Sequence, residues 1–313
     1  MRRSSPTILV TGSDGLVGSY VVRMLSESYR VVTTSRRELA FGQKSQNTIT
    51  LNLQSANEVR QLVNIQPDII IHLAAMLPTG TNDDAVIATN KLIDLNIFNL
   101  AKLVNASVVF CSSVSVYEGQ SGPWLESLPI NPTSKYAMSK LESEALFSSL
   151  DSGALSLRIS SPYGAVHHLR KGVLYQFARD SLAKKRLTIY GDGNRTQDFV
   201  HALDVAHFIK GVVENWSKSN GLVTRGVLNV ASGSPVSMSE LALLILHLTE
   251  NPKPLFYGDG DEDKECYRSH VSIDNAATLM NWKPLISLKC GLNNLLRVLE
   301  GKNEDWFAVR CAR

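Results

Sequence analysis

Three glycines near the start of the chain constrain its fold more than any other sequence feature. Gly12, Gly15 and Gly18 follow the β-rich run Thr7–Thr11 and lead into a stretch, 16–25, whose apolar residues recur with a helical period. A strand, a glycine turn and a helix in this order suit a tight turn, close packing of helix on strand, and close approach of the backbone to a pyrophosphate. Free amides at the helix start favour phosphate oxygens. We therefore expect a nucleotide-binding turn, with a purely structural glycine turn as the alternative.

Short apolar strands alternate with helices through the rest of the first half. We expect strands at 30–34, 48–51, 68–73, 107–111 and 154–159, and helices at 56–65, 84–104 and 134–150. Few polar residues interrupt these strands, which is typical of a parallel sheet covered by helices on both faces. The predicted fold class is α/β, a doubly wound parallel sheet (Rossmann) with a smaller C-terminal substrate-binding lobe.

The second half is less regular. Segment 186–200 is loop-like with two short strands, helices are expected at 205–216 and 238–249, and a strand at 226–230. The acidic stretch 252–265 is predicted to be solvated surface, with a cation site as the minority alternative. No linker divides the chain. We expect residues 1–165 and 200–232 to form the dinucleotide-binding domain, and 166–199 and 233–313 the substrate lobe.

Composition excludes several functional classes. The 313 residues are 44% hydrophobic, enough for one large domain or two modest ones. The net charge is +3, without a Lys/Arg run after the first three positions, so nucleic-acid binding has no electrostatic basis. The chain has no run of 18 apolar residues, so no membrane span is predicted. The cysteines at 111, 266, 290 and 311 lack metal-ligand spacing and are interpreted as free thiols, so we expect a cytoplasmic protein without a metal site.

The end of the second predicted strand bears on the cofactor. An NAD-preferring site would place a carboxylate there for the ribose 2′-hydroxyl, whereas this chain has Ser35, Arg36 and Arg37. Arginine pairs bidentately with a 2′-phosphate. NADP is therefore favoured over NAD, unless both arginines are ordinary surface charges.

A tyrosine and a lysine supply the candidate chemistry. Tyr136 and Lys140 are four residues apart and share one face of the predicted helix. A tyrosine pKa of about 10 is too high for a base at neutral pH. The lysine charge, with the cationic nicotinamide of an oxidised cofactor, would stabilise the phenolate. Ser113, just beyond strand 107–111, could hydrogen-bond the reacting oxygen, so the three residues predict a proton-transfer site.

These motifs, in this order, resemble the extended short-chain dehydrogenase/reductases, the NAD-dependent epimerase/dehydratase family of nucleotide-sugar-modifying enzymes, along essentially the whole chain. The matching segments are Thr11–Gly18, His72–Ala75, Asn90, Ser113, Tyr136 with Lys140, Arg158–Gly164 and Gly191–Asp204. The resemblance implies a catalytic set of Ser113, Tyr136 and Lys140. It also implies a cofactor-binding set that includes Tyr136 and Lys140 and otherwise consists of Gly12, Asp14, Gly15, Leu16, Val17, Ser35, Arg36, Arg37, Asn52, Leu53, Leu73, Ala74, Ala75, Asn90, Pro162 and Tyr163.

Three departures from the family pattern limit what the resemblance implies. Val114 and Ser115 follow Ser113 where dehydratases have Asp-Glu, which disfavours 4,6-dehydration. Ser161 replaces the Asn that touches the substrate diphosphate in epimerases, and Gln197 replaces the usual Arg, although Arg195 lies two residues earlier. The expected substrate-binding residues are Ser115, Ser161, His167 and Arg195.

The histidines allow two interpretations. His167 and His168 follow the Pro-Tyr-Gly turn, where one could be the extra acid or base of an epimerase. Exposed loop histidines are the simpler alternative. We expect His72 to be a packed strand-end residue, and His201 and Asp204 to set a turn and a helix cap.

The predicted activity is reversible hydride transfer at a sugar-like carbinol or ketone, by an epimerase or a ketoreductase. An NADPH-dependent ketoreductase of a non-nucleotide substrate and a non-catalytic NADP-sensing protein are the alternatives. The resemblance implies a homodimer built from helices 84–104 and 134–150. Ile87, Ile93, Ile97 and Leu141 would make its apolar contacts, although the same spacing could bury them against their own sheet.

Overall fold

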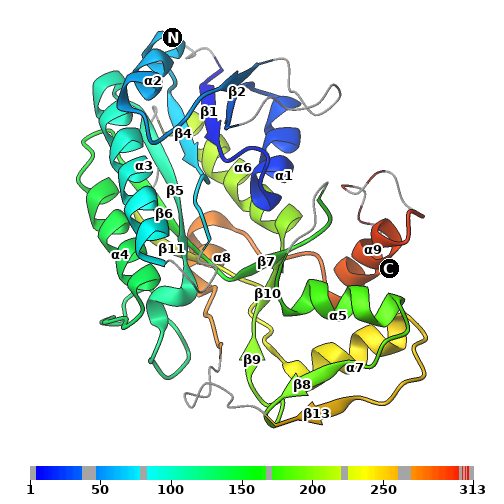
Figure 1. Ribbon diagram of the computed structural model, residues 1–313. Coiled ribbons are helices and arrows are strands. Elements are labelled where there is room, and N and C mark those ends of the chain that lie inside the picture. The colour runs from blue at the N-terminus through cyan, green and yellow to red at the C-terminus, as the bar shows by residue number, and fades with distance from the viewer. Residues whose placement is uncertain are drawn as a thin grey trace.

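A seven-stranded parallel sheet forms the centre of the computed structural model (Figure 1). The structure describes residues 5–36, 47–77, 83–166, 171–219, 225–259 and 269–302, together with Asp305, Phe307 and Val309. The strands of this sheet are β1 (Thr7–Thr11), β2 (Arg30–Ser35), β3 (Thr48–Thr50), β4 (Ile69–His72), β5 (Ser107–Ser113), β6 (Ala154–Ile159) and β11 (Gly226–Val230). Their order is β11-β6-β5-β4-β1-β2-β3, with every neighbouring pair parallel. The predicted doubly wound α/β fold is confirmed.

Alternate residues of the strands face two helical layers. Ile8 and Val10 of β1 belong to the core cluster that contains residues of α1 (Leu16–Ser26) and α6 (Ala202–Lys218). Leu9, between them, belongs to the cluster under α3 (Asp83–Val104) and α4 (Lys135–Ser148). Burial on both faces explains why these strands are almost continuously apolar.

Short elements flank the sheet. The segment predicted as one helix over 56–65 is α2 (Ala56–Arg60) followed by a 3-10 helix (Gln61–Ile65). Val114–Tyr117 form a second 3-10 helix directly after β5.

The C-terminal half builds a smaller lobe beside the carboxyl ends of the strands (Figure 1). It contains α5 (Val173–Leu182), α7 (Met238–Leu248) and α9 (Leu288–Leu299), which pack against one another. Three short strand pairs complete it: β7 (Ser161–Tyr163) with β10 (Phe199–His201), β8 (Thr188–Tyr190) with β13 (Phe256–Gly258), and β9 (Thr196–Gln197) with β12 (Val236–Ser237). The helix α8 (Asp274–Met280) packs near β11 and α6. The helices α5, α8 and α9 were not predicted from the sequence.

Two expectations about side chains are wrong. Cys290 is disulfide-bonded, so the four cysteines are not all free thiols; Cys111 is free. Ile87, Ile93 and Ile97 are buried within their own chain, and Ile93 and Ile97 belong to the core cluster between α3 and the sheet. Among the described residues, no helix has the length and apolar character to cross a membrane. The same part of the chain holds no cluster of potential metal ligands.

Candidate active site

The glycine turn is packed against the segment that comes after β4. Gly12 has a φ of +69°, and its carbonyl oxygen accepts a hydrogen bond from the Gly15 amide at 3.0 Å. A Cβ added to Gly12 would lie 2.7 Å from the Ala74 amide nitrogen, and one added to Gly18 only 2.1 Å from the Gly12 oxygen. Both positions therefore need glycine.

The first turn of α1 is open to an anion. Gly15 is its N-cap, and no side chain caps the helix. Its first residues, Leu16 and Val17, are buried. Backbone amides at an uncapped helix N-terminus, next to a tight glycine turn, suit a pyrophosphate. The residues present thus fit a dinucleotide.

Polar groups gather at the end of β2. The buried Ser35 hydroxyl donates to Asp14 Oδ2 at 3.3 Å. Arg36 is exposed at the same strand end, and Arg37 lies outside the described residues. The Asp14 carboxylate, through Ser35, and the exposed Arg36 are therefore both associated with the strand end where the sequence predicts the ribose of a dinucleotide.

Two further predicted cofactor segments line the same edge of the sheet. Asn90 on α3 holds the backbone of Met76, accepting from its amide at 2.8 Å and donating to its carbonyl at 2.9 Å. This clamp fixes the segment containing Leu73, Ala74 and Ala75. After β3, Asn52 is exposed and its side chain accepts from the Gln54 amide, whereas Leu53 is buried.

The structure brings Ser113, Tyr136 and Lys140 together. Ser113 ends β5, while Tyr136 and Lys140 lie in the first two turns of α4, which Ser134 caps. The Ser113 side chain is hydrogen-bonded to Tyr136, and its Oγ accepts from Ser115 Oγ at 2.9 Å. Lys140 Nζ donates to the Cys111 carbonyl at 3.0 Å.

Burial and charge act in opposite directions on the tyrosine. Burial raises the pKa of Tyr136, and the charge of Lys140 and the hydrogen bond with Ser113 only partly offset it. Burial alone would lower the pKa of Lys140, but Tyr136, Asp94 and other neighbours outweigh it and raise that pKa. Lys140 is therefore a cation and Tyr136 a protonated phenol at neutral pH, unless more positive charge is added next to the ring.

Of the expected substrate residues, Ser161 lies on a short strand, Arg195 directly precedes another, and Ser115 lies in the 3-10 helix after β5. Ser161 on β7 accepts a hydrogen bond from the Gln197 amide on β9. Arg195 is half-buried, and its carbonyl accepts from the Met238 amide at 3.0 Å. His167 and His168 lie outside the described residues.

The side chain of Tyr163 points away from the site. It is buried, and a Cβ on Gly291 of α9 would lie 2.2 Å from its hydroxyl oxygen. Only its backbone could therefore face a cofactor, whereas the neighbouring Pro162 is half-buried.

Comparison with known proteins identifies the family. The model of the NAD dependent epimerase/dehydratase family matches residues 8–231. The chain belongs to this family. The UDP-glucose 4-epimerase of Mycolicibacterium smegmatis is 26% identical over 323 residues, which cover 95% of this chain and 99% of that enzyme. UDP-glucuronic acid decarboxylase 2 of Arabidopsis thaliana is 27% identical over 312 residues, covering 93% of this chain and 68% of the decarboxylase.

A solved structure agrees with this assignment. MoeE5 in complex with UDP-glucose and NAD is 27% identical and superposes with a TM-score of 0.80, covering 94% of this chain and 99% of MoeE5. The resemblance inferred from the sequence motifs is confirmed.

Two histidines of this epimerase/dehydratase chain, His72 and His201, have the structural roles predicted for them. His72 is buried between Thr11 and Asp94, as predicted for a packed strand-end residue. His201 caps α6 by accepting from the Leu203 amide, also as predicted. Asp204 does not cap the helix: its carboxylate accepts from the amides of residues 285 and 286 and ties that segment to α6.

A buried polar network behind Lys140 was not predicted from the sequence. Glu144 on α4 is ion-paired with Arg158 on β6 at 2.7 Å and accepts from Ser112 at 2.5 Å. Asp94 on α3 accepts from Ser143 on α4 at 2.6 Å. A signal was available for Asp94, because this carboxylate lies on the apolar face of α3 beside Ile93 and Ile97.

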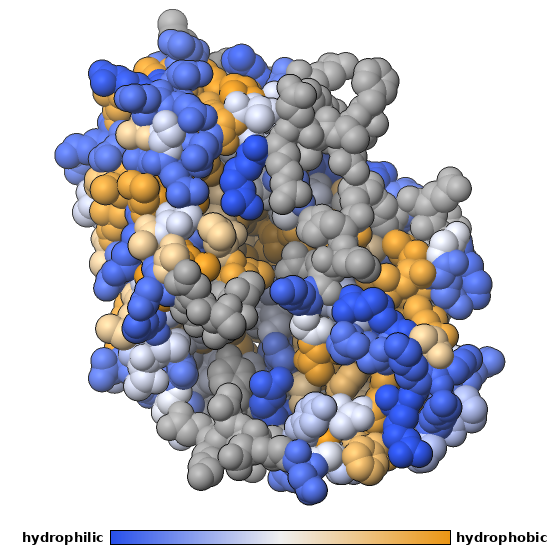
Figure 2. Space-filling view, viewed as in Figure 1, coloured by the Kyte–Doolittle hydropathy of each residue, from blue (hydrophilic) through white to orange (hydrophobic). Residues whose placement is uncertain are grey.

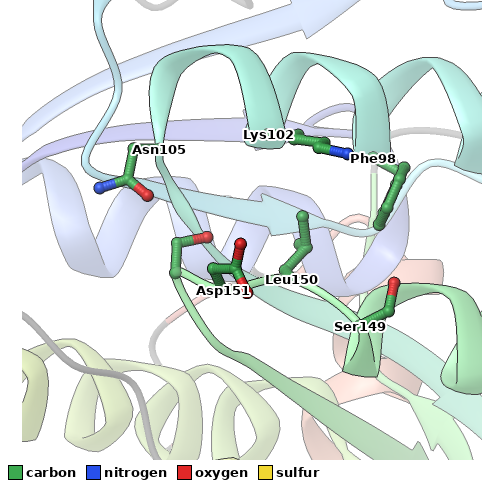
Figure 3. A pocket seen from close by; sticks show the side chains of 7 residues that line it. Phe98, Lys102, Asn105, Ser149, Leu150 and Asp151 are labelled. Atoms are coloured by element: carbon green, nitrogen blue, oxygen red, sulfur yellow. The ribbon is translucent and has the colours of Figure 1, made fainter.

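A small hollow of about 120 Å³ lies away from this site (Figure 3). Phe98 and Lys102 of α3 and the segment after α4, including Leu150 and Asp151, line it. Tyr136 is at the opposite end of α4, so this hollow is not part of the candidate active site.

Proposed function

We propose that the chain is an NAD(P)-dependent enzyme that transfers a hydride reversibly at a carbinol or ketone carbon of a nucleotide-sugar, with Tyr136 as acid and base. The observation that carries this proposal is the grouping of Ser113, Tyr136 and Lys140 at the carboxyl edge of the sheet that also holds the glycine turn. The epimerases and the UDP-glucose complex among its relatives support the substrate class.

The side chains divide the proton chemistry between them. When bound, the nicotinamide ring accepts a hydride from the substrate carbon or returns it. In the oxidative direction the Tyr136 phenolate takes the proton of the substrate hydroxyl, and in the reductive direction the phenol gives it back. Ser113 orients the substrate oxygen, and the Lys140 cation stabilises the phenolate. Because burial raises the pKa of Tyr136, the bare site favours the phenol, which is the form that a reduction needs.

The pyridine nucleotide would be held by the glycine turn, the first amides of α1, the ends of β2 and β3, and the segment clamped by Asn90. We propose that NADP is preferred, since Arg36 is exposed at the end of β2 and can pair with a 2′-phosphate. The Asp14 carboxylate, which accepts from Ser35, is the opposing charge at this position. The balance between Arg36 and Asp14 sets the preference.

We assign substrate binding to the lobe formed by 166–199 and 233–313, through His167 and Arg195, together with Ser115 and Ser161 from segment 1–165. The dinucleotide belongs to 1–165 and 200–232. Both an epimerase, which returns the hydride to the same carbon, and a net reductase are consistent with this assignment.

One observation favours a second candidate, a ketoreductase of a non-nucleotide substrate. The Gln197 side chain donates to Ser161 Oγ, so two neutral side chains pair, and one donor is used, where a diphosphate would need a cation or free donors. Arg195 is the cation nearest in sequence, two residues before Gln197.

We further propose a homodimer through α3 and α4. Figure 2 shows apolar residues gathered on the side of the molecule formed by these helices. The exposed apolar side chains there are Leu92, Leu95, Leu103 and Met138, in place of the isoleucines expected from the sequence. Leu95→Glu should convert a dimer into a monomer in analytical sedimentation; a monomeric native protein would refute this interface.

Identification of the nucleotide that copurifies tests the activity. Acid release and chromatography should find tightly retained oxidised cofactor if the enzyme is an epimerase, and UDP-glucose should then yield its 4-epimer without net cofactor turnover. A nearly empty site that binds NADPH indicates a net reductase. A native protein that retains no pyridine nucleotide and binds none in calorimetry would refute the proposed function.

A further inference from the structure

A continuous line of buried polar contacts joins the strand before the glycine turn to the helix that carries Tyr136. Thr11 Oγ1 lies 2.7 Å from His72 Nδ1, and His72 Nε2 lies 2.9 Å from Asp94 Oδ1. Ser143 Oγ donates to Asp94 Oδ2 at 2.6 Å. The four side chains come from β1, β4, α3 and α4, and all are buried.

The hydrogen bonds from Thr11 to His72 and from His72 to Asp94 are donated in the same direction. Thr11 Oγ1 accepts from the Ala74 amide at 3.2 Å, so its own proton is free to go to His72 Nδ1. The imidazole proton then resides on Nε2 and is donated to Asp94. Asp94 thus accepts on both oxygens, as an ionised carboxylate does. Burial opposes this ionisation, but the hydrogen bond and the electrostatic attraction of His72, then the charge of Lys140 and the hydrogen bond from Ser143, together outweigh it and lower the pKa of Asp94.

The charged groups around Lys140 indicate which carboxylate balances its charge. Tyr136 and Glu144 face the ammonium from α4, Cys111 from β5 and Asp94 from α3. Glu144 is already engaged by the Arg158 guanidinium, at 2.7 Å and 3.0 Å. Glu144 and Arg158 therefore cancel as a pair, and Asp94 is the carboxylate that remains to balance the buried lysine.

We propose that Asp94 is a positioning residue for the proton-transfer site: it fastens α4 to β4 and β1, and it balances the charge of Lys140 beside Tyr136. This inference rests on the proposed function for its catalytic meaning. Loss of the Asp94 charge would leave the Lys140 cation to act on Tyr136 alone, which favours the phenolate. Removal of Lys140 would instead leave Asp94 as an unbalanced buried anion.

A double-mutant cycle in thermal unfolding tests the charge balance without substrate or cofactor. Asp94→Asn and Lys140→Met should each lower the Tm, and the double variant should lose at least about 2 °C less than their sum. Additive losses would overturn the proposal. The cycle remains informative if Asp94→Asn folds poorly, because the double variant carries no unbalanced charge. Glu142→Gln is the matched control, since Glu142 pairs with Lys91 between the same two helices but at the surface; it should leave the Tm nearly unchanged.

The ultraviolet absorbance of tyrosinate supplies a measurement that a merely structural role would not change. In protein loaded with oxidised cofactor, the ionisation of Tyr136 is the titration step that disappears in Tyr136→Phe. The midpoint of this step should fall by at least about 0.5 pH unit in Asp94→Asn, about threefold in the ionisation constant. It should not move in Glu142→Gln. An unmoved step in Asp94→Asn would overturn the electrostatic role. Full turnover by Tyr136→Phe would refute the proposed function and leave the unfolding cycle unaffected.

Discussion

Gly18→Ala perturbs the glycine turn by the smallest possible change. The new methyl group would lie 2.1 Å from the Gly12 carbonyl oxygen, and 2.9 Å from the Gly12 carbonyl carbon and from Ser13 Cα. All three are backbone atoms, so no side-chain rotation relieves the contact. Either α1 or the turn must move, and both belong to the proposed cofactor site.

Two opposing effects set the magnitude. Alanine is favoured over glycine inside a helix by about 1 kcal/mol. Overpacking a close contact costs about 1–3 kcal/mol and sometimes more. A methyl at 2.1 Å from a backbone oxygen belongs at the upper end of that range. We therefore expect a net loss of about 2 kcal/mol, or about 3 °C in Tm for a chain of 313 residues.

Gly211→Ala is the matched control, because Gly211 is also inside a helix, α6. The nearest atom to its added Cβ is the flexible end of Met280, at 4.0 Å. Its Tm should stay the same or rise, because the free energy of unfolding should increase by up to about 1 kcal/mol. Circular dichroism melts and NAD(P)H titrations of both variants decide the matter. Gly18→Ala should also bind cofactor at least about tenfold more weakly, about 1.4 kcal/mol. A Gly18→Ala protein that melts no lower than the native chain and binds cofactor equally well would refute the reasoning.

Three further outcomes are expected. Arg36→Ala should erase a preference for NADPH over NADH worth about 1.5–3 kcal/mol; equal affinities in the native protein would contradict the assignment. Burial lowers the pKa of His201 to about 4, so between pH 6.5 and 4 the unfolded chain binds a proton on this residue that the folded chain does not. The free energy of unfolding should therefore fall by up to about 3 kcal/mol as the pH drops from 6.5 to about 4. His201→Asn, which keeps a capping side chain, should flatten that slope in denaturant titrations; an unchanged slope would count against it. Arg158→Met should lose about 3–5 kcal/mol, because Glu144 stays buried without its partner. Lys135→Met breaks an exposed ion pair and should lose less than about 1 kcal/mol, and similar losses in the two variants would refute this contrast.

The first half of the fold was predictable because its elements have strong local signals. The apolar run at 69–72 could only be a strand covered on both faces, and the glycines at 12, 15 and 18 indicated a tight turn into a helix directly after β1. In the second half, α9 has an equally local signal that was overlooked: Ser287 caps it, and Leu292, Leu295 and Leu296 recur on one face.

The candidate site was predictable where spacing along one helix fixes geometry, as for Tyr136 and Lys140. Contacts between distant elements were not. Nothing near Asp94 in the sequence shows that His72 and Ser143 meet it, because the sheet order and the packing of α3 on α4 create that contact. The isoleucines of α3 were misassigned to the dimer for the same reason: an apolar stripe does not reveal whether a sheet or a second copy covers it.

Turnover by Tyr136→Phe on the substrate that the native enzyme converts is the most direct test of the account. The phenyl ring fills the same space, so folding and cofactor affinity should change little. General acid–base catalysis contributes about 10²–10⁴-fold, so kcat should fall by at least about a hundredfold. Near-native kcat in this variant would mean that another group transfers the proton, and would contradict the central role given to Tyr136.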